Sequence, residues 1–455
     1  MVTLRGNYQC DVCKAKTLVR VQVGWLENHP VRFNCLKCGI LIMGTMYQDQ
    51  KNVSAHLELE NVTKVTSPKS DYYIEASGEL LTEKLQKFDY AESLIPTFFK
   101  TGTFTMENLM MDFREKVSRH LSMLEYEWPI YRRINELWFN KNYHYLRKEI
   151  RKKIDNKQYP LNNDLHFLMA LRHLNVHSMS KVLNNKFYKV KTPFTRTEVS
   201  LFYKDQKCEL TKLMIHFSKS FHNYDKKIFE AVDQFNQKFK YMIPVFGLDF
   251  YQDTTFNYNQ KGITTVSFED LKQFYVDTFE LVTELLDIVI AFNNLKYRNN
   301  YQTMKTKRKD VSTLDKYQTL NKGAKLEFID QIEVFDTLIY PSISNQIRNA
   351  IGHNSYEINV KEQLVLYYPT KSKNSEITDI TLIDFTKTCW ELFQSLMNIS
   401  ELIYQTRRFY LIHLGLSPTY EVIFDEKAKV IKNKSINKRK KTSKQKKLTK
   451  KNNRK

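Results

Sequence analysis

The residues best suited to chemistry lie close together in the segment 347–354. Asn349 follows Arg348 directly, and His353 comes five positions after the arginine. An arginine guanidinium stays charged at every cellular pH and grips a phosphate through two parallel hydrogen bonds. A histidine imidazole exchanges protons near neutral pH and serves as a general acid or base. These residue types at this spacing are the parts of a metal-independent RNA-cleaving site.

The residues around this motif predict a helix that ends at the histidine. Pro341 suits the first turn of a helix, where its missing N–H is harmless. Arg348 falls off the apolar stripe that recurs every fourth residue, at Ile343, Ile347 and Ile351. Gly352 and Asn354 tolerate left-handed backbone and stop a helix. We therefore expect His353 at the last turn, where the partial negative charge of the helix end favours a protonated imidazole.

A short β-segment and a long helix are predicted after the motif. Alternating apolar residues indicate three strands, at 356–360, 364–368 and 377–383. Asp384 can then cap a helix that runs to about Gly415. Upstream of the motif, Ser267 and Asp270 have the spacing of a capping box that opens a helix over 268–294.

The order of helix, Arg-Asn-x-x-x-His, short β-segment and long helix resembles HEPN domains, over roughly residues 265 to 415. This resemblance implies a four-helix bundle and a ribonuclease of bacterial toxin, abortive-infection or antiviral-defence systems. By position, Arg348 and His353 match the catalytic pair of the family, and Asn349 matches the polar residue that usually follows the arginine. The resemblance also implies a homodimer in which two motifs face one cleft, with tRNA, rRNA or mRNA as the substrate.

Four cysteines near the N-terminus form two CxxC pairs, Cys10 with Cys13 and Cys35 with Cys38. Each pair can aim two thiolates at one ion, and two pairs give the tetrahedral sulfur coordination that suits Zn²⁺. The segment resembles a zinc ribbon, and four sulfur ligands would leave the ion no open position, so we expect a structural role. A CxxC redox site or two disulfides are the alternatives, but no signal-peptide pattern points to an oxidising compartment.

A second arginine and histidine with similar spacing lie at Arg172 and His177. This arginine sits within an apolar helical stripe, no asparagine follows it, and no glycine precedes the histidine. We interpret the pair as structural. A diverged second copy of the motif is the alternative, and it would complete a site within one chain instead of between two.

The charge is concentrated at one end of the chain. Fifteen of the 71 Lys and Arg residues, and no Asp or Glu, lie between Lys427 and Lys455, so most of the net charge of +21 belongs to this tail. Such a segment cannot bury a core and offers salt-sensitive contacts to phosphates. We interpret a second basic segment, 297–313, as a mobile connector that lies near the bound RNA.

Length and composition set the expected architecture. Hydrophobic residues make up 42% of the 455 positions, and only 11 Gly and 10 Pro are present, which favours long helices. We predict a mainly α fold with four parts: a zinc ribbon (1–66), a helical middle domain of unknown role (67–262), a HEPN-like domain (263–418) and a basic disordered tail (419–455).

The middle domain includes an expected helix over 79–99.

No apolar run approaches the ~18 residues of a membrane span, so a cytoplasmic protein without membrane contact is expected. The competing hypothesis to a ribonuclease is a non-catalytic zinc-ribbon and HEPN module that binds nucleic acid or protein.

Overall fold

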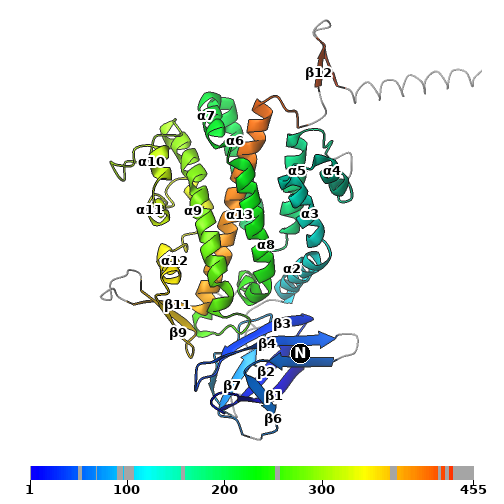
Figure 1. Ribbon diagram of the computed structural model, residues 1–455, viewed down its shortest axis with the longest axis vertical. Coiled ribbons are helices and arrows are strands. Elements are labelled where there is room, and N and C mark those ends of the chain that lie inside the picture. The colour runs from blue at the N-terminus through cyan, green and yellow to red at the C-terminus, as the bar shows by residue number, and fades with distance from the viewer. Residues whose placement is uncertain are drawn as a thin grey trace, which may run out of the picture.

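The chain folds into a β-rich N-terminal part and a larger helical body, which lie at opposite ends of an elongated molecule (Figure 1). The computed structural model describes residues 2–49, 54–67, 69–89, 96, 107–154, 159–251, 257–368, 377–418, 422–425 and 430–433. About 54% of the chain is helical and 17% is strand, in a mixed α/β arrangement. The predicted mainly α class is therefore wrong, because the N-terminal residues form sheets far larger than a small ribbon. The predicted HEPN-like four-helix bundle is not clearly matched either.

Two sheets build the N-terminal part. The strands in chain order are β1 (Val2–Cys10), β2 (Lys16–Val23), β3 (Asn28–Asn34), β4 (Leu41–Asp49), β5 (Ser54–Leu59), β6 (Val62–Val65), β7 (Tyr72–Ala76) and β8 (Gln86–Lys87). One sheet has the order β6-β1-β2-β7-β8, with β2 and β7 parallel, and the other has the order β3-β4-β5. Alternating apolar side chains from both sheets share one core, which includes Val19, Val21, Val31, Ile42, Met46 and Ile74.

Residues 79–89 form no helix, contrary to the first half of the helix expected over 79–99. Residues 79–89 run as an irregular segment that contains β8, while 90–95 and 97–99 lie outside the described residues. The buried Glu79 carboxylate accepts hydrogen bonds from the backbone N–H of Trp25 (2.7 Å) and from the Gln22 amide (3.0 Å). These long-range contacts outweigh the local helical pattern, and the β-rich part extends to Lys87 instead of ending at residue 66.

Among the described residues, the helical body contains four helices of 20 or more residues and several shorter ones. The helices are α2 (Glu107–Tyr126), α3 (Trp128–Phe139), α4 (Tyr143–Arg151), α5 (Asp164–Ser178), α6 (Thr192–Asp205), α7 (Lys207–Phe217), α8 (Phe221–Phe246), α9 (Phe268–Arg298), α10 (Leu314–Gln318), α11 (Lys322–Leu326), α12 (Asn345–Gly352) and α13 (Leu382–His413). The π-helical turn η1 (Phe187–Lys191) and the 3-10 turns η2 (Gly247–Phe250), η3 (Tyr258–Gln260) and η4 (Asp336–Leu338) connect them.

Helix α13 is the centre of this body. Most of its residues are buried, and it packs against α5, α6, α8 and α9 (Figure 1). Phe235 of α8 stacks on Phe393 of α13 with ring centroids 3.7 Å apart. One hydrophobic core therefore continues across the boundary predicted between residues 262 and 263.

A fragment of residues 263–418 alone is expected not to fold, because it lacks α5, α6 and α8 and would expose the apolar faces of α9 and α13 that they cover. A fragment of residues 107–418, which keeps these helices, is the matched control and should give a cooperative thermal transition by circular dichroism. A cooperative transition in the shorter fragment would show that the region after residue 262 is an independent domain.

Several expected helix boundaries are confirmed by their caps. The capping box of Ser267 and Asp270 opens α9. The side chain of Thr381, rather than that of Asp384, caps α13, accepting the Asp384 N–H at 3.0 Å.

The predicted β-segment is a three-stranded antiparallel sheet in the order β11-β10-β9, made of β9 (Tyr356–Asn359), β10 (Leu364–Tyr367) and β11 (Thr378–Thr381).

Two further strands lie in the segment expected to be a disordered tail. They are β12 (Val422–Asp425) and β13 (Val430–Asn433), which pair as an antiparallel hairpin. The basic residues after 433, which carry most of the tail's charge, lie outside the described residues.

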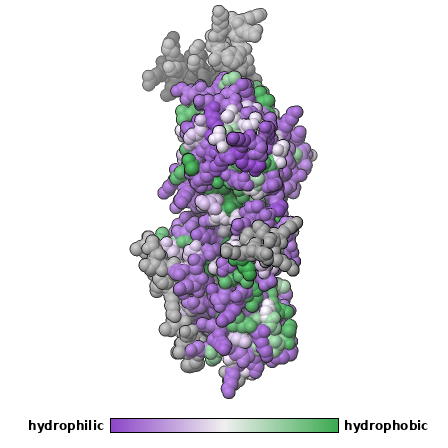
Figure 2. Space-filling view, turned by 90° about the vertical axis from the view of Figure 1, so that its left-hand side faces the viewer, coloured by the Kyte–Doolittle hydropathy of each residue, from purple (hydrophilic) through white to green (hydrophobic). Residues whose placement is uncertain are grey.

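Hydrophilic side chains cover most of the face formed by α10, α11, α12 and the β9–β11 sheet, with apolar groups gathered at mid-height and near the lower end (Figure 2). Among the helices of the described residues, none has the length and apolarity needed to cross a membrane.

Candidate functional site

The Arg-Asn-x-x-x-His motif lies on α12 and at its end, as its sequence predicts. The helix starts four residues later than Pro341, because the Ser344 side chain caps it by accepting the N–H of Gln346. His353 is the C-terminal cap residue, and its N–H donates to the Asn349 carbonyl at 2.9 Å. The left-handed conformation of Asn354, with φ of 50°, then ends the helix.

Helix α12 packs on α9 through its buried side, which carries Ile347 and Ala350. Arg348 and Asn349 are consequently half-buried at the rim of this contact, whereas His353 is exposed. Within the described part of the chain, no side chain forms a hydrogen bond with the His353 ring. The imidazole is therefore open to a ligand from solvent.

The Arg348 guanidinium lies near the C-terminal end of α12, where His353 caps the helix. Its Nε donates to the Glu280 carboxylate at 2.6 Å, and its Nη1 donates to the Asn349 side-chain oxygen at 3.2 Å. A Cβ placed on Gly352 would lie 3.9 Å from Nη1, so the guanidinium passes close to the residue that precedes His353. The structure thus brings all three residues of the predicted motif to one end of α12.

Glu280 of α9 orients this arginine and was not identified from the sequence. Its carboxylate also pairs with Lys322 of α11, so one anion holds two cations. Burial raises the pKa of Glu280, but Lys322 and Arg348 outweigh burial and lower it overall. Because Glu280 and Arg348 are 68 positions apart, no local spacing could reveal their contact.

Tyr356 is a second polar residue beside the motif that local patterns did not single out. Its hydroxyl lies 3.1 Å from both Lys272 and Glu269 of α9, and its ring packs edge-on against Phe268. The tyrosine fixes the start of β9 on α9, three residues after His353.

The four cysteines meet in one cluster where the two N-terminal sheets come together. Cys10 and Cys13 lie in the turn between β1 and β2, and Cys35 and Cys38 lie in the turn between β3 and β4. Both turns have the same backbone design. The residue after the second cysteine is left-handed in each, with φ of 63° at Lys14 and 77° at Gly39.

The sulfur positions fit a tetrahedral metal ion. All four lie within 4.8 Å of one another, with 3.7 Å between Cys10 and Cys38 and 3.5 Å between Cys13 and Cys35. Sulfurs about 2.3 Å from a central Zn²⁺ lie about 3.8 Å apart, whereas the two sulfurs of a disulfide lie about 2.05 Å apart. The cluster is thus compatible with a metal site, and none of the cysteines is disulfide-bonded.

Backbone N–H groups of each turn point at the first sulfur. Burial raises the pKa of Cys10, but the N–H groups of Cys13 and Val12 and the neighbouring thiols lower it to about 7. Burial raises the pKa of Cys35 to about 12, despite the N–H groups of Cys38 and Lys37. Such N–H groups stabilise thiolates, which are the form that binds a metal ion.

The second arginine and histidine pair is built differently. Arg172 points inward from α5, with Nη2 2.8 Å from the buried Glu401 carboxylate and its guanidinium over the Tyr404 ring. His177 stacks on His173, with ring centroids 6.3 Å apart. Arg172 is therefore committed to an ion pair within the bundle, in agreement with the structural interpretation.

The basic segment 297–313 is packed rather than a mobile connector. Lys305 lies within 3.3 Å of the carboxylates of Asp330, Glu333 and Asp336, and Met304 and Val311 are buried. Burial lowers the pKa of Lys305, but Asp336 and the other two acids outweigh burial and raise it. The positive charge of Lys305 is thus neutralised by carboxylates of the protein itself.

Comparison of this chain with protein-family models, curated proteins and solved structures gave no match.

Proposed function

We propose that the protein is an endoribonuclease whose active site is built on Arg348, Asn349 and His353. The observation that carries the proposal is the position of the Arg348 guanidinium, which lies close to the helix end that bears the exposed His353. A cation and a proton carrier on one accessible surface are what phosphodiester cleavage requires. We also propose that the protein acts in a bacterial toxin or phage-defence system, which is the setting that the HEPN resemblance implies.

The proposed reaction is an internal transesterification of RNA. The 2′-hydroxyl oxygen attacks the adjacent phosphorus, and the bond to the 5′-oxygen of the next nucleotide breaks. The products are a 2′,3′-cyclic phosphate and a 5′-hydroxyl. The attacking 2′-hydroxyl gives up a proton and the leaving 5′-oxygen takes one up, and His353 exchanges these protons with solvent.

Arg348 stabilises the charge that develops on the phosphorane oxygens. Glu280 takes its Nε–H, and Asn349 takes one N–H of Nη1, which leaves further Nη N–H groups as donors for a phosphate. Asn349 shares its side-chain oxygen with Nη1 and thereby fixes the plane of the guanidinium. Glu280 and Asn349 are positioning residues for Arg348 in this scheme.

We propose Zn²⁺ as the ion of the four-cysteine cluster, with Cys10, Cys13, Cys35 and Cys38 as its ligands. The sulfur spacing and the backbone N–H groups around two of the sulfurs support this assignment. Four sulfur ligands leave no open position, so the role is structural. The ion would join the turn of one N-terminal sheet to the turn of the other and takes no part in the reaction.

A homodimer is part of the proposal. Arg348 keeps 33% of its side chain exposed, and the His353 ring lies on an open surface. A second copy facing this surface would enclose an RNA strand between two motifs and exclude water from it.

The ends of the cleaved RNA test the proposed reaction. Incubating the full-length protein with cellular RNA should give fragments with 5′-hydroxyl and 2′,3′-cyclic phosphate ends, because the internal 2′-hydroxyl is the nucleophile. Ligation of the 5′ ends with and without prior kinase treatment, followed by sequencing, distinguishes these ends from 5′-phosphates. Fragments with 5′-phosphates would exclude the reaction, and RNA binding without cleavage would favour the non-catalytic alternative.

A further inference from the structure

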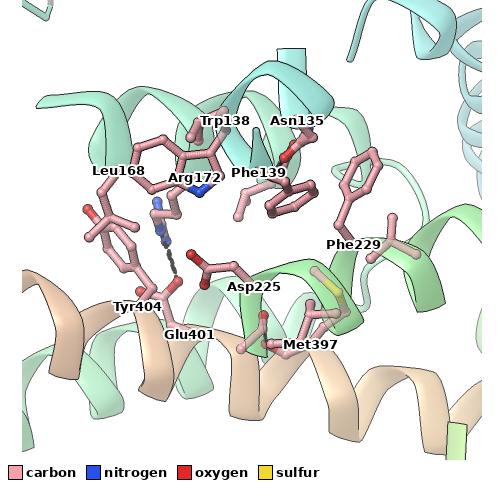
Figure 3. A pocket seen from close by; sticks show the side chains of 16 residues that line it. Asn135, Trp138, Phe139, Leu168, Arg172, Asp225, Phe229, Met397, Glu401 and Tyr404 are labelled. Carbon is pink, nitrogen blue, oxygen red and sulfur yellow. Dashed lines mark hydrogen bonds and ion pairs between the residues drawn. The ribbon is translucent and has the colours of Figure 1, made fainter. Parts of the chain in front are cut away.

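A cavity lies inside the helical body, far along the chain from the Arg348 motif. Residues of α3, α5, α8 and α13 line it, and it has a volume of about 100 Å³ (Figure 3). An apolar cavity on the order of 150 Å³ holds a benzene ring. The space is smaller than that cavity, so it admits at most one six-membered ring and is too small for a fused pair of rings.

Aromatic side chains form much of its wall. Trp138 and Phe139 come from α3, Phe229 from α8 and Tyr404 from α13 (Figure 3). The Phe139 and Phe229 rings meet at a tilt of 56°, with their centroids 5.9 Å apart. Walls of this kind favour a flat aromatic guest, which gains stacking and edge-on contacts in addition to apolar burial.

The charges around the cavity cancel in two ion pairs. Arg172 pairs with Glu401, and Arg407 pairs with Asp225 while lying over the Trp138 ring. A charged guest would have to break one of these pairs and leave a buried charge without its partner, which is costly. The guest is therefore expected to carry no net charge.

Two polar groups remain available to such a guest. Figure 3 shows the Asp225 carboxylate directed into the cavity, where it can accept a hydrogen bond. Burial raises the pKa of Asp225, and the positive charge of Arg407 offsets this only in part. Asn175 uses one amide N–H to reach Asn135 at 3.1 Å; among the bonds recorded for the described residues its second N–H is not engaged.

From these contacts we infer that the cavity is a binding site for an uncharged pyrimidine, as a free base. A pyrimidine base is a single flat ring that carries N–H donors beside carbonyl acceptors. Its donor faces Asp225, its acceptor faces Asn175, and its faces lie among the aromatic rings. The site is separate from the proposed ribonuclease motif and does not depend on its activity.

Isothermal titration of the full-length protein with small ligands tests this assignment. Cytosine or uracil should bind at least tenfold more tightly than toluene, which fits the cavity but makes no hydrogen bond. Adenine, with its fused rings, should not compete. Equal affinity for toluene and the pyrimidines, no pyrimidine binding at millimolar concentration, or preference for adenine would each overturn the inference.

Two variants locate the binding. Asp225→Asn keeps the shape of the side chain and should weaken pyrimidine binding about tenfold while leaving toluene binding unchanged. Ser400→Trp should fill the cavity and abolish binding of both ligands without removing an ion pair. The matched control is Asp310→Asn, at an exposed ion pair with Arg308.

Pyrimidine binding that survives Ser400→Trp in a folded protein would place the ligand elsewhere and overturn the assignment. The ranking of the three ligand types on the unmodified protein needs no variant, so it decides the question if either substitution prevents folding.

Discussion

Replacing Arg348 or His353 with alanine is expected to lower RNA cleavage by about 100-fold or more, because each change removes a charge-stabilising or proton-transferring group at the reacting phosphate. Neither change should unfold the protein. His353 is exposed, and Arg348 lies outside the apolar contact that Ile347 and Ala350 make with α9. Initial rates on a labelled RNA, compared with circular dichroism of each variant, measure the two effects separately.

The matched controls are Arg119→Ala and His144→Ala. Both residues are exposed, and Arg119 forms an ion pair with Glu115 on its own helix, so its removal should leave cleavage unchanged. Arg172→Ala is unsuitable as a control, because it would leave the buried Glu401 carboxylate without its partner. Cleavage that persists in the folded His353→Ala variant would contradict the proposed active site.

In the proposed dimer, the two single variants are not expected to complement each other. A mixed pair of chains still lacks one arginine and one histidine at the shared cleft, so wild-type activity should not return.

Brief treatment with EDTA should leave cleavage intact, because the proposed ion is structural and held by four sulfurs. Immediate loss of activity in EDTA, with the fold preserved, would indicate metal-dependent cleavage.

The double substitution Cys35→Ser, Cys38→Ser is expected to remove about one equivalent of Zn²⁺ per chain, since it deletes half of the ligands. Elemental analysis of the purified protein measures this loss. Structural Zn²⁺ contributes about 10–16 kcal/mol to the folding of isolated zinc-finger peptides. Here the two sheets also share an apolar core, so we expect local opening of β3 and β4 rather than complete unfolding.

Hydrogen exchange would localise the effect of the cysteine substitutions. Amides of β1 to β4 should exchange faster in the double variant, while those of α9 and α13 keep their protection. Cys208→Ser is the matched control, because Cys208 is exposed and lies outside the cluster. An unchanged zinc content in the double variant would rule out the four-cysteine assignment.

The features that the sequence by itself determined are those set by neighbouring residues. Two CxxC turns bring their thiols together, because each turn fixes two cysteines and the left-handed residue after them. Ser267 and Asp270 open α9, and Asn354 ends α12, because a cap depends on residues within one turn of the helix. Arg348, Asn349 and His353 meet at one helix end for the same reason.

Tertiary structure alone decided which distant groups meet. Glu280 and Lys322 join Arg348 across three helices, and the Phe235–Phe393 stack unites regions that the sequence divides at residue 262. Residues 79–89 are not helical, because the Glu79 carboxylate accepts hydrogen bonds from backbone groups of an earlier loop. Lys305 lies in a cluster of acidic residues from a distant segment, which pair with its charge. Such contacts depend on how whole elements pack, since burial and charge pairing between remote segments outweigh local propensity, and no spacing along the chain records them.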